Sequence, residues 1–180
     1  MSIYTRAGDT GSTSLFGGKK VLKCNELVDV YGSIDELNSW IGFCISDMTD
    51  KKTTGFLQTV QRDLLVIGST LAGWKGDIKN LPNRVIEMEQ RIDVMEKTLP
   101  KLSNFILPGG NKDAAAIHVA RSITRRVERQ TVFLLRKNKN DKTIIITYLN
   151  RFSDLLFVIA RFINMNSKTP ELVWNGKSNK

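Results

Sequence analysis

The sequence predicts an all-α protein, an up-and-down five-helix bundle with four-helix-bundle-type packing. Two observations carry this prediction: five segments have apolar residues at the spacing of an amphipathic helix, and the connections between them are short. The chain of 180 residues suits one domain that spans residues 1–180. Within it we expect an N-terminal loop at 1–23, a helical bundle at 31–164 and a tail at 165–180.

The first two helices are predicted at residues 31–48 and 55–72. Apolar residues from Ile34 to Ile45 share one face of the first helix, and Asp35 lies on another side. The second repeats this spacing from Phe56 to Leu71. Both helices should therefore bury one face in a common core.

The third helix is expected at residues 83–99, after a break at 74–82 that is rich in Gly, Asn and Pro. Asn83 is its predicted N-cap, and Pro100 ends it. Residues 103–111 then form an apolar arm that ends in the turn Pro108-Gly109-Gly110.

The last two helices are predicted at residues 113–135 and 143–164. The core face of the fourth should hold six residues: Ala116, Val119, Ala120, Ile123, Val127 and Leu134. The fifth should bury Leu149, Phe152, Leu155, Leu156, Ile159 and Ile163, with Thr147, Asn150, Asp154 and Arg161 on its other side.

The first eighteen residues are nearly all glycine, hydroxyl and charge, with Tyr4, Leu15 and Phe16 as apolar anchors. Glycines allow main-chain N–H groups to approach an anion closely. A flexible tail would explain the polarity but not the anchors, and the Walker pattern is absent. We therefore predict a phosphate-binding loop with these participants: Thr5, Arg6, Gly8, Gly11, Thr13, Ser14, Gly17 and Gly18.

The polar face of the fourth helix is unusually basic. It is predicted to hold His118, Arg121, Arg125, Glu128 and Arg129, and four arginines fall within the nine residues from 121 to 129. Such a stripe is often a solvated face with ion pairs one turn apart. Because crowded arginines repel one another and a guanidinium binds phosphate oxygens bidentately, the density favours a polyphosphate site.

The net charge of +9 raises the question of nucleic-acid binding. Part of the excess falls at Lys51-Lys52, at 136–142 and at 177–180, which we interpret as solvated loops and a frayed tail. A nucleic-acid-binding protein should also lack Asp35, Glu128 and Asp154 among its basic residues. We therefore expect neither nucleic acid nor membrane as a partner.

The composition of the chain indicates where in the cell the protein works and which metal sites it can form. No apolar run is long enough to span a bilayer, and the N-terminus does not resemble a signal peptide, so we expect a cytoplasmic protein. Cys24, Cys44 and the single His118 are too few for a Cys/His metal site. Both cysteines are expected to be plain thiols.

On the fifth helix, Asn150 and Asp154 lie one turn apart, so that an amide and a carboxylate point into the same space. The alternative is that Asp154 pairs with Arg151 or Arg161. This helix alone does not decide between a site and a salt bridge.

Considered together, these segments resemble the PduO-type ATP:cob(I)alamin adenosyltransferases in order and spacing, over nearly the whole chain. The matching segments are residues 4–18, Lys23, 31–42, 105–110, 121–129, 148–157 and 170–174. The resemblance implies a five-helix bundle of ferritin-like packing and a homotrimer with active sites between subunits. It also implies transfer of the 5′-deoxyadenosyl group of ATP to reduced cobalamin, giving adenosylcobalamin and triphosphate.

The resemblance also assigns the site residues. ATP binding falls on Thr5, Arg6, Ala7, Gly8, Thr13, Ser14, Lys23, Arg125, Arg126, Glu128, Arg129 and Asn150. Cobalamin binding falls on Phe105 and Asp154, and Asp35 and Arg121 match a pair across the subunit boundary. The catalytic group is then Arg125, Asp35, Arg121 and Phe105, and Mg²⁺ is expected on the ATP phosphates with no protein ligand assigned.

Two positions depart from the family pattern: Ala7 stands where Thr is common, and Leu27 where Arg is common. The implied partners are a corrinoid reductase and a B12-dependent enzyme. A nucleotide-binding sensor on the same scaffold, without the chemistry, is a further alternative.

Overall fold

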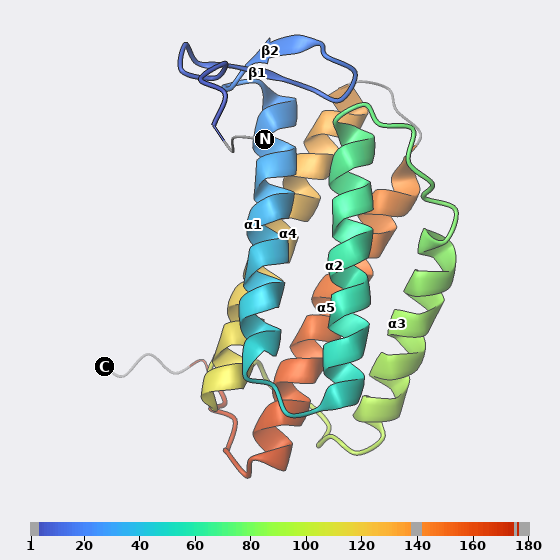
Figure 1. Ribbon diagram of the computed structural model, residues 1–180. Helices are drawn as coiled ribbons and strands as arrows, with labels where there is room; N and C mark the ends of the chain where they lie inside the picture. The colour runs from blue at the N-terminus through green and yellow to red at the C-terminus, as the bar shows by residue number, and fades with distance from the viewer. Residues whose placement is uncertain (1–3, 138–141, 175, 177–180) are drawn as a thin grey trace.

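The computed structural model describes residues 4–137, 142–174 and 176. Five helices follow a short N-terminal hairpin, as Figure 1 shows. The helices are α1 (Glu26–Ser46), α2 (Lys51–Leu71), α3 (Leu81–Glu96), α4 (Lys112–Lys137) and α5 (Thr143–Asn166). All five predicted helices are confirmed.

Successive helices run in opposite directions, so that the chain passes up and down the molecule (Figure 1). α1 packs against α2 and α4, and α5 packs against α4 and α3. The hairpin of β1 (Ser12–Ser14) and β2 (Lys20–Leu22) lies beyond the first turn of α1. The bundle thus presents α4, with its arginines, next to both α1 and α5.

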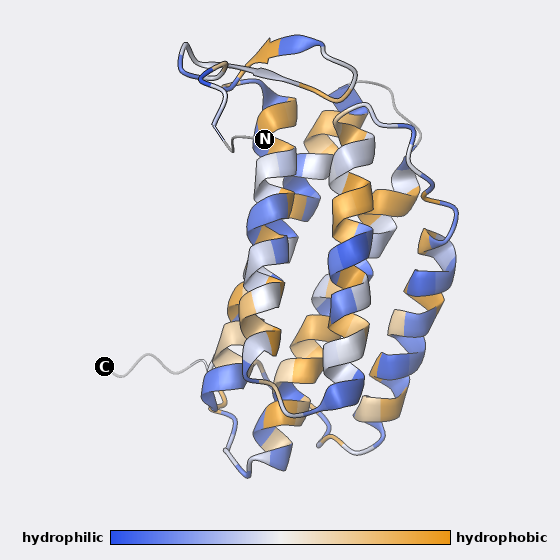
Figure 2. Ribbon diagram, viewed as in Figure 1, coloured by the Kyte–Doolittle hydropathy of each residue, from blue (hydrophilic) through white to orange (hydrophobic). Residues whose placement is uncertain are grey.

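One hydrophobic core joins all five helices. The predicted apolar faces of α2 and α5 are confirmed, because Val60, Leu64, Leu149 and Phe152 are fully buried. Figure 2 shows apolar residues along α5 in the middle of the bundle and more hydrophilic residues on α3 at the edge. By length and composition α5 could cross a membrane, but it is the core helix here and 56% of its apolar window is buried.

Three helix starts, those of α1, α2 and α3, differ from the predictions by more than one residue. α1 begins five residues early, because the side chain of Asn25 caps it by accepting a hydrogen bond from the Leu27 N–H at 2.9 Å. α3 begins at Leu81 after Asn80, so the prediction of Asn83 as N-cap is wrong. Pro82 lies in the first turn of α3, where a proline costs no helical hydrogen bond.

The two lysine runs also contribute to helices. Lys51 and Lys52 begin α2, where the Asp50 carboxylate accepts from the Lys52 N–H at 3.0 Å, so the loop expected there is wrong. Arg136 and Lys137 form the last turn of α4. The rest of the 136–142 run, apart from Lys142, and residues 177–180 lie outside the described residues.

A polar network attaches α3 to the bundle. Arg84 of α3 donates to Asp63 of α2 at 2.9 Å and also pairs with Glu87. The Tyr148 hydroxyl of α5 donates to the same Asp63 at 3.1 Å. Burial opposes ionisation of Glu87, but Arg91 and Arg84 outweigh it and lower the pKa of that carboxyl. The network therefore joins α2, α3 and α5 at one point.

Two helix faces differ from the predicted patterns. Val119, predicted in the core, is 41% exposed, and Arg161, predicted on the polar side of α5, is buried. Arg161 can be buried because it donates to Glu171 at 3.0 Å and to the Pro100 carbonyl at 2.8 Å. A helical wheel cannot anticipate partners that come from loops.

Candidate functional site

The N-terminal loop folds around the β1–β2 hairpin. Thr13 pairs with Val21, and the Lys23 N–H donates to the Gly11 carbonyl at 2.8 Å. A Cβ placed on Gly8 would lie 3.1 Å from Lys23 Nζ, so the ammonium group sits directly over the Gly8 backbone. The structure thus brings Lys23 into the predicted phosphate-binding loop.

The N-terminal part of the loop is exposed. Arg6 has a φ of 60°, and the Ala7 N–H donates to the Thr5 hydroxyl at 3.4 Å. Among the described residues no hydrogen bond commits the side chains of Arg6, Thr13 or Ser14 to the body of the protein. These donors are therefore available to a ligand.

Of the three predicted anchors, Phe16 reaches the helical body. Its ring lies edge-on to Trp74, 6.1 Å between centroids, at the end of α2. Tyr4 does not act as an anchor: it is largely exposed and stacks against Arg6 at 5.8 Å. The loop is held by its own hairpin and by one aromatic contact.

A small pocket of about 260 Å³ lies between α4 and α5, and we call it the arginine pocket. The Asn150 amide of α5 donates to Glu128 of α4 at 3.1 Å, and Arg129 donates to the Arg125 carbonyl at 3.1 Å. Four predicted ATP residues therefore meet in one place. The full lining is Arg125, Glu128, Arg129, Val132 and Asn150.

Arg126 points elsewhere. It pairs with Glu36 of α1 at 2.5 Å and donates to the Ser33 hydroxyl at 3.4 Å. In one subunit Arg126 is thus a contact between α1 and α4, and it does not line the arginine pocket. No hydrogen bond or ion pair in the described part of the chain joins the N-terminal loop to that pocket.

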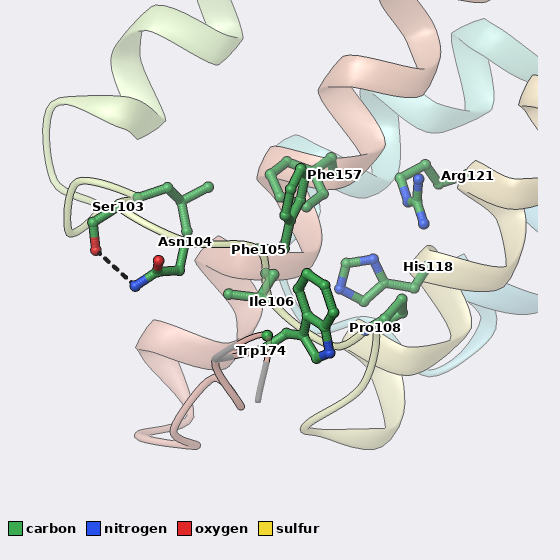
Figure 3. Close-up of a pocket in the computed structure, with 11 residues that line it drawn as sticks. Ser103, Asn104, Phe105, Ile106, Pro108, His118, Arg121, Phe157 and Trp174 are labelled. Carbon is green, nitrogen blue, oxygen red and sulfur yellow. Dashed lines mark hydrogen bonds between the residues drawn. The ribbon is translucent and has the colours of Figure 1, made fainter. Parts of the chain in front are cut away.

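A larger cavity of about 770 Å³ opens beside the arm of residues 103–111, and we call it the arm cavity. Figure 3 shows the residues that line it: Phe105 of the arm, Trp174, Phe157 of α5, and His118 and Arg121 of α4 on the right of the view. Phe105 is 78% exposed, and its ring lies 6.3 Å from that of Trp174. The wall therefore contains three Phe and Trp rings among other residues and can accept a large flat ligand.

The arm is held at both ends. At one end the buried Asn164 of α5 donates to the Gly109 carbonyl at 3.0 Å and accepts from the Asn111 N–H at 2.9 Å. At the other end residues 171–174, which we call the strap, pair with the arm. Leu107 N–H donates to Leu172 O and Trp174 N–H donates to Phe105 O, both at 2.8 Å.

Asp35 and Arg121 do not meet within one subunit. Asp35 is exposed and lines a groove of about 350 Å³ between α1 and α2, whereas Arg121 lines the arm cavity. The Arg121 Nε atom is buried without a hydrogen-bond partner, and burial, together with the charge of Arg125, lowers the pKa of Arg121. Each group lacks its predicted partner in the described part of this chain.

Asp154 lies apart from both pockets. Its carboxylate accepts from Arg151 at 2.7 Å, and Arg151 also pairs with Glu89 of α3 at 2.9 Å. Of the alternatives left open by the sequence, the pairing with Arg151 is the one that forms. In one subunit the structure does not bring Asp154 to Phe105.

Sequence reasoning missed His118, Phe157 and Trp174 as cavity residues. His118 was expected on the solvated face of α4, yet it is only 3% exposed because the arm covers that side of the helix. Its position one turn before Arg121 was the available signal. Trp174 and Phe157 stand within segments that carry the family resemblance, but nothing in their spacing indicates a cavity.

No group of three or more His, Cys, Asp or Glu side chains that could hold a metal ion occurs among the residues the structure describes. The arginine pocket offers one carboxylate, Glu128. Cys44 is buried, which raises the pKa of its thiol to about 11, and Cys24 is exposed. The donor set fits a metal that arrives on a phosphate ligand.

Comparisons with known proteins agree with this geometry. A sequence model of the cobalamin adenosyltransferase family matches residues 3–163. The corrinoid adenosyltransferase of Bacillus subtilis (strain 168) is 40% identical over 173 residues, 93% of this chain and 89% of that protein. The Homo sapiens corrinoid adenosyltransferase MMAB is 36% identical over 182 residues, 96% of this chain and 72% of that protein.

Solved structures give the same result. A variant of the PduO-type ATP:corrinoid adenosyltransferase from Lactobacillus reuteri, complexed with cobalamin and ATP, has a TM-score of 0.89 at 34% identity. The match covers 97% of this chain and 100% of that one. A second variant of that enzyme, complexed with ATP, has a TM-score of 0.86 over 96% of this chain and 100% of that one, also at 34% identity. The chain therefore belongs to the cobalamin adenosyltransferase family.

Proposed function

We propose that this protein transfers the 5′-deoxyadenosyl group of ATP to the cobalt of cob(I)alamin, giving adenosylcobalamin and triphosphate. Cobalt(I) supplies an electron pair to C5′, a cobalt–carbon bond forms, and the C5′–oxygen bond to the triphosphate breaks. The triphosphate leaves with the electrons of that bond. No general base is needed, since no proton is removed from the nucleophile.

The observation that carries this proposal is the placement of two pockets on one helix. Arg121 lines the arm cavity and Arg125 lines the arginine pocket. Residues four apart on a helix are separated by about 6 Å along its axis. A large aromatic cavity and a small cationic pocket therefore lie one turn apart, as a corrin ring and a polyphosphate require.

On the nucleotide side, the task of the protein is to hold a leaving group of high charge. Arg125 and Arg129 of the arginine pocket, with Lys23 and the N–H groups of its loop, would bind the phosphate oxygens. Such donors lower the barrier when charge grows on the leaving oxygen. Mg²⁺ enters with ATP as part of the substrate, and Glu128 is the carboxylate nearest to that charge in the pocket.

On the corrin side, Phe105 would cover one axial position of the cobalt. An exposed ring in an aromatic wall excludes water from that position, and four-coordinate cobalt(II) is easier to reduce than cobalt(II) that keeps an axial ligand. The cavity therefore prepares the nucleophile as well as binding it. A corrinoid reductase would supply the electron, and a B12-dependent enzyme would receive the product.

We propose further that the working form is a homotrimer of ferritin-like bundles with sites between subunits. Among the described residues of one chain, no hydrogen bond or ion pair joins the N-terminal loop to the arginine pocket, and Asp35 and Arg121 line different pockets. A neighbouring copy of the chain would bring its N-terminal loop to the arginine pocket of this one, and its Asp35 to this Arg121. The fold and its family are compatible with a cytoplasmic location.

The test is to mix the protein with ATP, Mg²⁺ and chemically reduced cobalamin and to follow the corrinoid spectrum. We expect conversion to adenosylcobalamin with one triphosphate released per corrinoid. If ATP binds but the corrinoid spectrum does not change, the nucleotide-sensor alternative replaces this proposal.

A further inference from the structure

The polar wall of the arm cavity contains an imidazole with no partner. His118 is 3% exposed, and neither Nδ1 nor Nε2 has a hydrogen-bond partner in the part of the chain that the structure describes. Buried polar atoms without partners are rare in folded proteins, because each one costs the desolvation of that atom without compensation. The free protein is therefore incomplete at this position.

The ring points into the cavity. In Figure 3 it extends from α4 between Arg121 and Pro108, toward Phe105 and Trp174. Its centroid lies 6.0 Å from that of Phe157, and the two ring planes are tilted by 59°. The nearby Phe105 and Trp174 side chains are largely exposed, so they can shift to admit a ligand without loss of core packing.

The charge state of the ring follows from its surroundings. Burial lowers the pKa of His118, the charge of Arg121 lowers it further, and Glu171 acts weakly in the opposite direction. The imidazole is thus neutral at physiological pH, with one N–H donor and one acceptor nitrogen. A primary amide offers the complementary pair, a carbonyl acceptor and an NH₂ donor.

We propose that His118 is a corrinoid-binding residue that hydrogen-bonds an amide side chain at the edge of the corrin ring. The inference rests on the proposed function, because it names the ligand of the same cavity. A corrin ring carries primary amide side chains at its rim, whereas ATP has no primary amide. His118 therefore discriminates in favour of the corrinoid and leaves ATP binding alone.

The experiment compares His118→Phe, His118→Gln and the control Thr124→Val in the full-length protein. Phe retains the ring volume without hydrogen bonds, and Gln restores a donor and an acceptor. Thr124 is a fully buried polar residue on the same helix that donates to Ala120 O at 2.8 Å and does not line the cavity. Three quantities are measured for each variant: the dissociation constant of cob(II)alamin with ATP present, the dissociation constant of ATP, and the melting temperature.

We expect His118→Phe to weaken cob(II)alamin binding about tenfold, the effect of one hydrogen bond to a buried group. ATP affinity and melting temperature should not fall, His118→Gln should recover much of the loss, and Thr124→Val should bind the corrinoid normally. Unchanged corrinoid binding in His118→Phe, a Gln variant no better than Phe, or a parallel loss of ATP affinity and stability would each overturn the assignment.

Turnover by the wild-type protein separates the two proposals. If wild type makes adenosylcobalamin and His118→Phe binds corrinoid as wild type does, only the role of His118 is wrong. If wild type neither binds nor converts the corrinoid, both proposals fail.

Discussion

Arg125 is exposed on α4, and in the described part of the chain its guanidinium forms no ion pair. Its neighbour Arg126 is occupied by Glu36 of α1. Two adjacent arginines thus have different tasks, one in the contact between helices and one in the arginine pocket. Substitution of Arg125 therefore tests ligand binding without breaking the contact that Arg126 makes between α1 and α4.

Arg125→Ala is expected to abolish turnover while the fold stays intact, because the side chain lies off the core face. The loss of kcat/KM should correspond to about 2 kcal/mol or more of transition-state stabilisation, as for a charge-assisted contact removed from a site. Arg136→Ala, an exposed arginine in the last turn of the same helix, is the control and should behave as wild type. Near-normal kcat/KM in Arg125→Ala would refute the phosphate role.

Phe105→Ala is expected to impair the reduction of bound cobalt(II) much more than it impairs ATP affinity. Because Phe105 is exposed, its truncation should cost little core packing, so a simple stability effect is not expected. Reduction is followed in the visible spectrum with a chemical reductant of fixed potential. Phe133→Ala is the control, because Phe133 is an exposed aromatic residue near the C-terminal end of α4. An equal loss of cobalt(II) reduction and of ATP affinity, or a fall in melting temperature alone, would favour a packing role for Phe105.

At the scale of elements, the turn that ends the arm depends on one glycine. Gly110 has a φ of 104°, and a Cβ there would lie 2.3 Å from Asn164 Oδ1. Asn164 in turn holds both Gly109 and Asn111. Any side chain at Gly110 must therefore displace the residue that positions the arm.

Gly110→Ala should lower the free energy of unfolding by about 1–3 kcal/mol, since the strained backbone and the clash add together. It should also weaken corrinoid binding, because the arm loses its anchor. Gly109→Ala is the matched control: a Cβ at Gly109 meets no atom within 4 Å. Thermal unfolding and cob(II)alamin titration of the two variants provide the measurement, and equal stability of both would contradict the role of Asn164.

The sequence predicted the helices well because their apolar spacing is regular and the core follows it. The hairpin was not predicted, since its strands, Ser-Thr-Ser and Lys-Val-Leu, are only three residues long and show no alternation of apolar and polar side chains. His118 and Arg161 were misplaced for a related reason. Both face loop segments, the arm and the strap, whose position no helical period encodes.

The candidate site was predicted unevenly for the same reason. Residues that share a helix turn, such as Arg125 and Arg129, were predicted together and lie together. Residues that meet only through tertiary structure, such as His118 with Trp174, were not. The family resemblance is confirmed, whereas its individual residue roles stay predictions until they are measured.

At the scale of the whole molecule, the arrangement of Asp35 and Arg121 bears on assembly. Within one subunit they line different pockets, so a direct pair needs a second copy of the chain. An exposed ion pair contributes about 0–1 kcal/mol, while removal of one partner from a shielded pair costs nearer 3 kcal/mol. The two cases can be told apart by mutation.

Asp35→Asn should weaken both the trimer and turnover, and Arg121→Gln should do the same, with non-additive effects in the double variant. Glu26→Gln is the control, because it breaks the exposed Glu26–Lys137 pair within one chain and should change neither property. Light scattering and turnover on the four variants test this. A wild-type monomer, or fully additive losses, would rule out the pair.

The strap has a consequence for the thermodynamics of ligand capture. Two backbone hydrogen bonds join the strap to the arm, and the Arg161–Glu171 pair joins the strap to α5. Asn164 of α5 binds the other end of the arm. The conformational entropy of ordering the arm backbone is therefore lost when the chain folds and not when a ligand binds, whereas the exposed Phe105 ring stays free to move. The backbone of this wall is preorganised, so binding of a corrinoid has to order only side chains such as Phe105 and Trp174.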